Sequence, residues 1–469
     1  MVKDTDRRPA GYSQQEPFDR DRYERDLRER MRNREIERNR DANAKRIKIK
    51  GILYGVLLLA LLALFVAMNA HGAVVSDQIF DSRFRTLKTS VADEFMAAPV
   101  IRLGTNDRII VNFDEIGEDN SFLQYRLIHC NADWEPSRLV ESEYLDGFNV
   151  NDVRDFAFSS GTFVHFINYQ IEIPNEDVRL RYSGNYLLQV FHQDDPDRVV
   201  LQTRFMVSEN TAIVEGGALS RTDRGHYSEW QQLELTVDGD ASGISNPYSD
   251  ILVRVDQNGR EETARWLRNP TRVEGVRMTY EHQPDLIFPA SNEYRRFESV
   301  SNGFPGMHVD SLRYMGSNYH VWLKKDEPRA YREYEYDRTQ HGRFLVREYN
   351  STDSDLGADY ITVHFLLETD RIPDADVYVD GEFTHGLYTD ANRMTYDPEA
   401  GAYRAEIPVK QGAYNYQYVV RYARNLQPSP GPIEGDKYET DNEYRVAVYF
   451  RPPGSRGDRL IGFRLLGNR

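Results

Sequence analysis

Apolar and polar residues alternate over short stretches in most of the chain after residue 100. A period of two residues is typical of half-buried β-strands, because successive side chains point to opposite faces of a sheet. Pairs that favour tight turns, such as Gly184-Asn185 and Asp380-Gly381, separate several of these stretches. The clearest alternation occurs in residues 186–190, 201–207, 233–237, 251–255, 319–323, 361–367, 414–420 and 444–450. The sequence therefore predicts an all-β fold without long amphipathic helices.

The length of the chain and its aromatic content divide these strands among several domains. At 469 residues the chain exceeds the usual size of one hydrophobic core. Its 30 tyrosines suit pleated strands better than helices. We predict consecutive immunoglobulin-like or early-set β-sandwich domains. The expected limits are 74–210 for the first, 211–349 for the second and 350–451 for an early-set-like third, followed by a short, turn-rich tail at 452–469.

Segment 51–73 has the pattern of a secretory signal. An uninterrupted apolar run extends from Ile52 to Met68, after a flank rich in Lys and Arg, and small residues such as Ala70 follow it. A basic flank, an apolar core and a small-residue exit together make an export signal. We expect cleavage after Gly72, with cleavage after Ala73 as the alternative.

The same region also fits an uncleaved membrane anchor. A run of about 17 apolar residues is at the low end for spanning a bilayer. Residues 1–50 form a charged leader whose composition suits disorder or a solvated helix, and Met31 is an alternative start to Met1. With either a signal or an anchor, the basic flank stays in the cytoplasm and the rest of the chain is exported.

The charge of the exported body argues against nucleic acid as a partner. Residues 1–50 hold 16 of the 59 Lys and Arg residues and 11 of the 75 Asp and Glu residues. Residues 51–73 hold neither kind, so 43 basic and 64 acidic residues remain, a net charge of −21. An acidic body repels phosphate backbones and suits a basic protein surface.

The sequence offers no constellation for catalysis or cofactor binding. It contains no Gly-x-Ser-x-Gly elbow, no spaced histidine pair on a helix and no glycine-rich phosphate loop. His129, Cys130 and Asp133 are candidate zinc ligands, but no second cluster follows at the spacing of a zinc site. Cys130 is the only cysteine and lies in an alternating run, so we interpret it as a buried apolar residue. We expect a non-enzymatic protein without cofactor, metal or small-molecule substrate.

One segment in which cations and aromatic rings interleave is the candidate partner-binding surface. It comprises Tyr294, Arg295, Arg296 and Phe297. Tyr and Arg are favoured at the centres of protein interfaces, whereas an exposed hairpin arm is the simpler explanation of such a stretch. We expect an exposed arm here, with these four residues as candidate contacts to a partner.

Several segments together resemble one known family. They are YRLIHCNADW at 125–134, PNED at 174–177, SGNY at 183–186, FPASNEYRRF at 288–297, DKYETDNEY at 436–444 and DRLIG at 458–462. They resemble the plug proteins of the type IX secretion system of Bacteroidota, over about residues 75–463. The resemblance implies a periplasmic protein without catalytic residues that binds the outer-membrane translocon barrel and its associated components. It implies that the protein closes the periplasmic mouth of the barrel when no cargo passes.

Two other functions stay open at the level of sequence. The third predicted domain is similar to early-set sandwiches that accompany glycogen-handling enzymes, which suggests a periplasmic carbohydrate-binding protein. Its nearest aromatic residues are Phe383, Tyr388 and Tyr396, without a tryptophan. A periplasmic enzyme is the third possibility, because the absence of a sequence motif does not exclude an active site.

Overall fold

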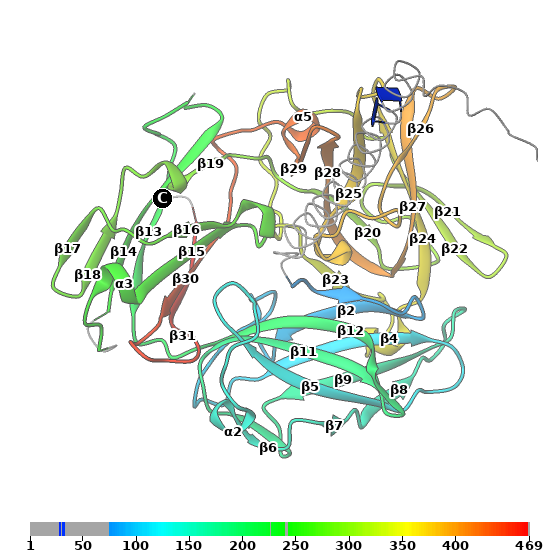
Figure 1. Ribbon diagram of the computed structural model, residues 1–469. Helices are drawn as coiled ribbons and strands as arrows, with labels where there is room; N and C mark the ends of the chain where they lie inside the picture. The colour runs from blue at the N-terminus through cyan, green and yellow to red at the C-terminus, as the bar shows by residue number, and fades with distance from the viewer. Residues whose placement is uncertain (1–27, 30, 33–74, 226, 240–242, 468–469) are drawn as a thin grey trace, which may run out of the picture. The chain divides into compact units, whose positions relative to one another are not determined.

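The computed structural model describes residues 28, 29, 31, 32, 75–225, 227–239 and 243–467 (Figure 1). The predicted apolar segment and the cleavage positions after Gly72 and Ala73 lie outside the described residues, as does nearly all of the charged leader. In the part of the chain that is described, no helix is both long and apolar enough to span a bilayer.

The predicted all-β fold of β-sandwiches is confirmed, although the second sandwich is interrupted in sequence by the third. Strands arranged in several sheets make up most of the regular structure between residues 75 and 467. Among the described residues of this range, the helices are single turns, namely α2 (Glu141–Tyr144), α3 (Pro247–Asp250), α4 (Ser354–Gly357) and α5 (Gly431–Glu434), with 3-10 turns η2 (Glu261–Thr263), η3 (Pro284–Leu286) and η4 (Glu382–Thr384). The absence of long helices agrees with the period of two residues in the sequence.

The first sandwich packs two sheets around a core of aromatic and branched side chains. One sheet has the order β2 (Phe84–Val91), β4 (Ile109–Ile116), β9 (Phe166–Ile173), β8 (Asp155–Phe158). The other has the order β1 (Gln78–Ile79), β12 (Asp195–Ser208), β11 (Gly184–His192), β5 (Leu123–Cys130), β7 (Asn151–Asp152), with β3 (Val100–Arg102) beside β12. A short pair, β6 (Leu145–Gly147) and β10 (Val178–Leu180), closes one side. Residues of both large sheets, such as Phe113 and Tyr186, belong to one buried cluster.

The second sandwich is built from strands that are distant in sequence. One sheet has the order β13 (Ile213–Leu219), β14 (Trp230–Asp238), β18 (Arg277–Tyr280), β17 (Arg272–Glu274), with β19 (Ile287–Pro289) on β14. The other has the order β16 (Arg265–Leu267), β15 (Ile251–Gln257), β30 (Tyr444–Phe450), β31 (Arg459–Leu466). In Figure 1, β30 and β31 are drawn in red among the green strands of this sandwich. Its buried cluster accordingly combines residues such as Val253 and Val446.

The third sandwich lies in sequence between strands of the second. One sheet has the order β20 (Arg295–Ser299), β28 (Gly412–Tyr422), β23 (Phe344–Val346), with β25 (Ala375–Asp380) and β29 (Asn425–Ser429) on β28. The other has the order β21 (Val309–Met315), β22 (Asn318–Leu323), β24 (Tyr360–Glu368), β27 (Ala402–Lys410), β26 (Thr395–Asp397). A single buried cluster of residues between 297 and 433 fills it.

Strand pairing therefore crosses the limits expected after residues 349 and 451. β15 and β30 pair along their full length, from Ile251 opposite Phe450 to Gln257 opposite Tyr444. The segment expected to be a turn-rich tail contains β31, in which Leu460 is fully buried. The limits after residues 349 and 451 were meant as the ends of units that fold independently. Strand pairing does not test independent folding, so these limits stay predictions.

Candidate functional site: buried junctions and exposed surfaces

A fully buried ion pair joins the first sandwich to the third. The side chains of Lys410, at the end of β27, and Asp114, in β4, are each 1% exposed, and Nζ lies 2.6 Å from Oδ2. Lys410 Nζ also donates a hydrogen bond to the carbonyl of Asp355 at 2.6 Å and lies 4.0 Å from the centroid of the Phe166 ring. Asp114 accepts a hydrogen bond from the Tyr360 hydroxyl at 2.7 Å. Buried charges persist only where they are paired and hydrogen-bonded, so this contact requires one fixed arrangement of the two sandwiches.

A buried carboxylate makes a second contact between the same two sandwiches. Asp359, directly before β24, accepts hydrogen bonds from the backbone N–H groups of Phe163 at 2.9 Å and Val164 at 3.0 Å. The backbone N–H of Ser160 donates to the carbonyl of Leu356 at 3.0 Å. Hydrogen bonds to a charged acceptor are among the stronger ones in proteins. The loop between β8 and β9 is therefore held against the third sandwich.

A small apolar cluster joins the first sandwich to the second. The Tyr449 hydroxyl, from β30, donates to Asn185 Oδ1 in β11 at 2.9 Å. Cys130 lies in this cluster with no exposed surface, which confirms its interpretation as a buried apolar residue. Burial raises the pKa of the Cys130 thiol to about 12, so it carries no thiolate at neutral pH. The cluster consists of Cys130, Ala132, Trp134, Leu187, Met206, Ala447, Tyr449 and Leu460.

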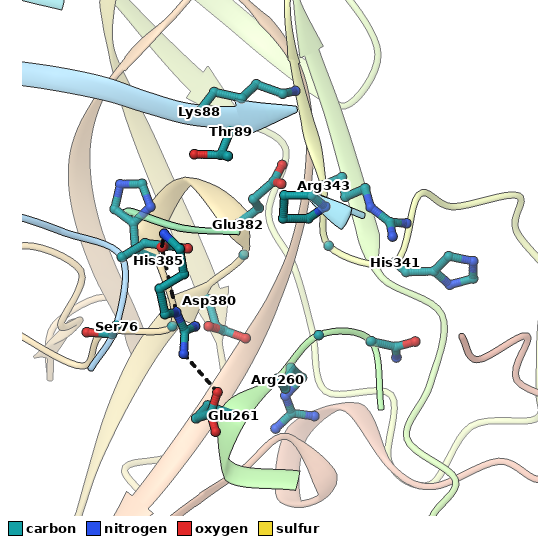
Figure 2. Close-up of a pocket in the computed structure, with 18 of the residues that line it drawn as sticks. Ser76, Lys88, Thr89, Arg260, Glu261, His341, Arg343, Asp380, Glu382 and His385 are labelled. Carbon is teal, nitrogen blue, oxygen red and sulfur yellow. Dashed lines mark hydrogen bonds and ion pairs between the residues drawn. The ribbon is translucent and has the colours of Figure 1, made fainter. Parts of the chain in front are cut away.

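A polar cavity of about 160 Å³ lies where residues of all three sandwiches meet (Figure 2). Its cations have carboxylate partners close by. Arg204 Nη1 lies 3.0 Å from Glu261 Oε2, and Arg260 Nη2 lies 2.6 Å from Glu262 Oε1. This pairing leaves the cavity without the excess positive charge that an anion site needs.

Burial favours the neutral forms of His385 and Lys88, two further groups of the cavity. Burial lowers the pKa of His385, which therefore stays neutral near pH 7. Burial also lowers the pKa of Lys88, whose ammonium group donates to the carbonyl of Phe344 and faces the ring of that residue at 4.6 Å. Among the described residues, no group of three or more His, Cys, Asp or Glu side chains is arranged to hold a metal ion. We interpret the cavity as a junction between the sandwiches.

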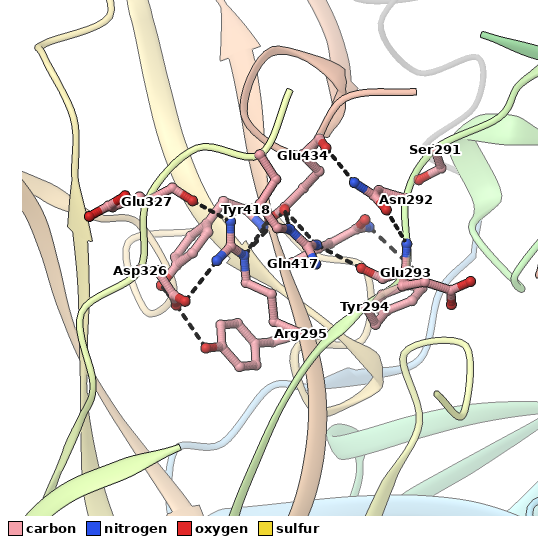
Figure 3. A network of polar contacts seen from close by, with 12 residues as sticks. Ser291, Asn292, Glu293, Tyr294, Arg295, Asp326, Glu327, Gln417, Tyr418 and Glu434 are labelled. Carbon is pink, nitrogen blue, oxygen red and sulfur yellow. Dashed lines mark hydrogen bonds and ion pairs between the residues drawn. The ribbon is translucent and has the colours of Figure 1, made fainter. Parts of the chain in front are cut away.

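The predicted partner-binding segment lies at the centre of a buried polar network (Figure 3). Arg295 Nε donates to Glu434 Oε1 at 3.0 Å, and its Nη1 donates to Asp326 Oδ1 at 2.7 Å. Its guanidinium also lies 5.2 Å from the centroid of the Tyr418 ring. Burial opposes ionisation of Glu434, but the nearby charges of Arg295 and Arg329 prevail and lower its pKa. The network satisfies each of these charges inside the protein.

The prediction of an exposed arm at this segment is wrong. Tyr294 is 4% exposed and Phe297 is fully buried, with its ring stacked 5.0 Å from that of Tyr414. Arg296 is one-quarter exposed and pairs with Asp337 at 2.6 Å. Sequence alone did not show the carboxylates that neutralise the two arginines, because they come from distant segments. A role of the four residues in binding a partner stays a prediction, and burial leaves Arg296 the most accessible of them.

A family model and a solved structure are both similar to this chain. Residues 84–209 match the family described as the first domain of the type 9 secretion system plug protein. The crystal structure of a hypothetical protein from Parabacteroides merdae is 36% identical, with a TM-score of 0.82, and the match covers 85% of this chain and 100% of that chain. The chain belongs to the plug protein family of the type IX secretion system. Membership in the plug family gives it a role connected with type IX secretion, as a component of a non-catalytic family.

Other comparisons add nothing to this assignment. Latent PorU from Porphyromonas gingivalis aligns with 82% of this chain and 34% of that chain at 11% identity, and its TM-score of 0.13 carries no argument. No curated protein matches the chain.

The aromatic residues considered for carbohydrate binding pack within this plug-family body. Phe383 contacts Tyr414 edge to face at 5.3 Å, and Tyr396 contacts Tyr403 at 5.0 Å. Tyr388 packs on Tyr378 at 5.4 Å. A sugar-binding platform needs an exposed ring face. These contacts partly cover the three rings, and the carbohydrate alternative, which rests on the likeness to early-set sandwiches, stays a prediction.

The structure also presents a segment that sequence reasoning did not single out. Residues 324–343 form a long connection between β22 and β23, which we call the strap. Tyr331 at its centre is 101% exposed, and Tyr336 is 64% exposed. Ordered loops of this length in a compact domain are usually functional. The available sequence signal was the density of tyrosines and charges at 331–336.

Proposed function

We propose that this chain is a non-enzymatic plug that binds and closes the periplasmic mouth of the type IX translocon barrel when cargo is absent. The observation that carries the proposal is the buried Lys410–Asp114 pair, which links sandwiches one and three within a member of the plug family. A steric block must keep its shape against the flow of solutes, and a chain of loosely linked domains does not. Inter-domain contacts inside one chain are usually small and polar, so fully buried ion pairs are a specific indication of a fixed arrangement.

The surface of the body also suits a separable complex. The residues after 73 carry a net charge of −21, which keeps the body soluble and steers it toward a basic partner. Exposed aromatic side chains such as Phe163 and Tyr314, whose rings lie 5.1 Å apart, offer apolar anchors within a polar surface. An interface of standard size with such anchors permits both closure and release.

The direct test measures the conductance of the purified translocon barrel in a planar bilayer. Addition of the exported body to the periplasmic side is expected to close open barrels in a saturable manner. The barrel without the protein serves as the open reference, and bovine serum albumin serves as the control for nonspecific block. Unchanged conductance at saturating protein, or no measurable binding, contradicts the plug function.

A plug at the outer membrane must leave the inner membrane. We therefore propose a periplasmic protein released by cleavage of its leader. N-terminal sequencing of the protein recovered from the envelope is expected to begin at Ala73 or Val74. Recovery of intact chain starting at Met1 or Met31 in the inner-membrane fraction contradicts release.

A further inference from the structure

A groove of about 420 Å³ opens between the strap and the segment that follows α5. The strap contributes Ala330, Tyr331, Glu333 and Tyr334 to one wall. The opposite wall consists of Gly431, Pro432 and residues 435–439, and Ser228 and Glu229 of the second sandwich complete the lining. The groove therefore lies on the outside of the body and shares no lining residue with the cavity described above.

The walls of this groove are tied to one another. The backbone N–H of Ala330 donates to the carbonyl of Ile433 at 3.0 Å, and that of Tyr438 donates to the carbonyl of Ser228 at 3.1 Å. Gly435 has a φ of 80°, and a Cβ there would lie 2.8 Å from the Ala330 Cα, so the close approach of the two walls requires glycine. A partner would meet a preformed groove and would lose little entropy in ordering it.

The buried polar network around Glu293 and Glu434 also holds the strap (Figure 3). The Tyr334 hydroxyl donates to Glu293 Oε1 at 2.8 Å, and Arg329 Nη2 donates to Glu434 Oε2 at 2.7 Å. Glu293 also accepts a hydrogen bond from the backbone N–H of Asp441 at 3.0 Å. Arg295 and Arg296 of the segment predicted to bind a partner donate to Asp326 and Asp337 of the strap, so this segment positions the strap that borders the groove.

The groove carries an excess of negative charge. Its lining includes four carboxylates, Glu229, Glu333, Asp436 and Glu439, and no residue in the described part of the chain forms an ion pair with any of them. The one ammonium group of the lining, that of Lys437, donates to the carbonyl of Ala330 at 3.3 Å. Such a surface attracts a cationic partner and repels an anionic one.

Tyrosine rings stand beside these carboxylates. Tyr331 is 101% exposed and Tyr438 is 40% exposed. An exposed tyrosine face binds Lys and Arg side chains by cation–π contact, and tyrosine is favoured at the energetic centre of interfaces. Carboxylates and ring faces in one groove match an extended peptide that carries several basic side chains.

We propose that this groove binds an extended Lys- and Arg-rich stretch on the periplasmic side of the translocon barrel. The proposal rests on the plug function and assigns the surface through which the body recognises the barrel. The acidic groove guides the approach of the basic stretch, and Tyr331 anchors it once bound.

The first experiment uses the fact that the only cysteine, Cys130, is buried. A Tyr331→Cys variant therefore accepts a thiol-linked photocrosslinker at one exposed position. Illumination with the purified barrel is expected to yield a crosslinked product. The matched control is Tyr248→Cys, which replaces a tyrosine that is 54% exposed on the second sandwich, and it is expected to yield none. Binding of the barrel without a crosslink from position 331 overturns the groove but keeps the plug function. Failure to bind the barrel at all overturns both.

The second experiment separates charge from shape. Tyr331→Ala is expected to weaken barrel binding about 30-fold, the loss typical of an interfacial anchor. Glu333→Gln combined with Glu439→Gln is expected to slow association and to flatten its dependence on salt. The control combines Glu399→Gln with Asp119→Asn, two exposed carboxylates outside the groove, and is expected to leave both unchanged. If the two double variants slow association equally, the proposal is overturned, because the net charge of the body would then explain the effect without the groove.

Discussion

Removing the ammonium group of Lys410 tests whether the sandwiches are locked together. Methionine has nearly the length of lysine, so Lys410→Met deletes the charge with little change in volume. Asp114 would then be a carboxylate that is 1% exposed and lacks its cation. It would keep hydrogen bonds from the Tyr360 hydroxyl at 2.7 Å and from Asn168 Nδ2 at 2.8 Å. Breaking a buried ion pair usually lowers the free energy of unfolding by about 3–5 kcal/mol. Because two hydrogen-bond donors to Asp114 remain, we expect a loss near the lower limit for Lys410→Met.

Two companion variants make the magnitude interpretable. Asp114→Asn combined with Lys410→Met removes both charges and should be less destabilising than the sum of the single changes by about 2 kcal/mol or more. The control on the same strand is Arg404→Met, which breaks an ion pair with Asp397 at 3.3 Å whose side chains are 57% and 31% exposed. An exposed pair contributes about 0–1 kcal/mol.

Urea unfolding of the exported body, followed by tryptophan fluorescence and circular dichroism, measures these differences. Trp134 lies where the first and second sandwiches meet, Trp230 and Trp266 lie in the second, and Trp322 lies in the third, so the fluorescence reports on all three. The variant should unfold at lower urea, with the two sandwiches no longer melting together. A cost for Lys410→Met as small as that of the exposed control, or additive single changes, would refute the reasoning that this pair locks the body.

Three further outcomes are expected from the same structure. The Cys130 thiol should react with iodoacetamide only after unfolding, and Cys130→Ala should lose about 1 kcal/mol while retaining barrel binding; labelling of the native protein contradicts this. Burial raises the pKa of Asp326, but the nearby His308 imidazole and the Arg295 charge prevail and lower it to about 2. A depressed carboxyl pKa stabilises the fold above the unfolded value near 4, so about 2 kcal/mol should be lost between pH 4 and pH 2, and Asp326→Asn should lack this part of the pH dependence. Phe297→Ala should lower the free energy of unfolding by about 3–5 kcal/mol, whereas Phe297→Leu should keep barrel affinity; a loss of affinity in folded Phe297→Leu would restore the idea of a direct contact.

Local patterns in the sequence were sufficient for the fold class. The alternating stretches 361–367 and 414–420 correspond to β24 and β28. In β24 alternate side chains are buried, and in β28 the buried side chains are nearly continuous. The same reasoning placed Cys130 in the interior. The period of two residues and the turn pairs depend only on residues that are close in the sequence, so they can be read from it directly.

Contacts between distant segments were beyond this reasoning. Arg295 and Arg296 look like surface cations because their partners, Glu434, Asp326 and Asp337, follow more than 30 residues later. The segment predicted as a turn-rich tail, 452–469, contains strand β31, which pairs with β30. Electrostatic neutralisation and sheet closure are properties of three-dimensional proximity, which composition and spacing do not encode.

The interruption of the second sandwich has a consequence for how the chain matures after export. β15 cannot pair with β30 until β30 is available, and about 190 residues, including the whole third sandwich, separate the two strands in sequence. Until then, the row of backbone groups on that side of β15 is unpaired, beside Val253 and Val255, which are fully buried in the finished protein. Exposed strand edges invite aggregation and proteolysis. A chain clipped anywhere before residue 444 would keep this edge and its apolar side chains exposed, so the second sandwich is complete only in a molecule that extends through β30.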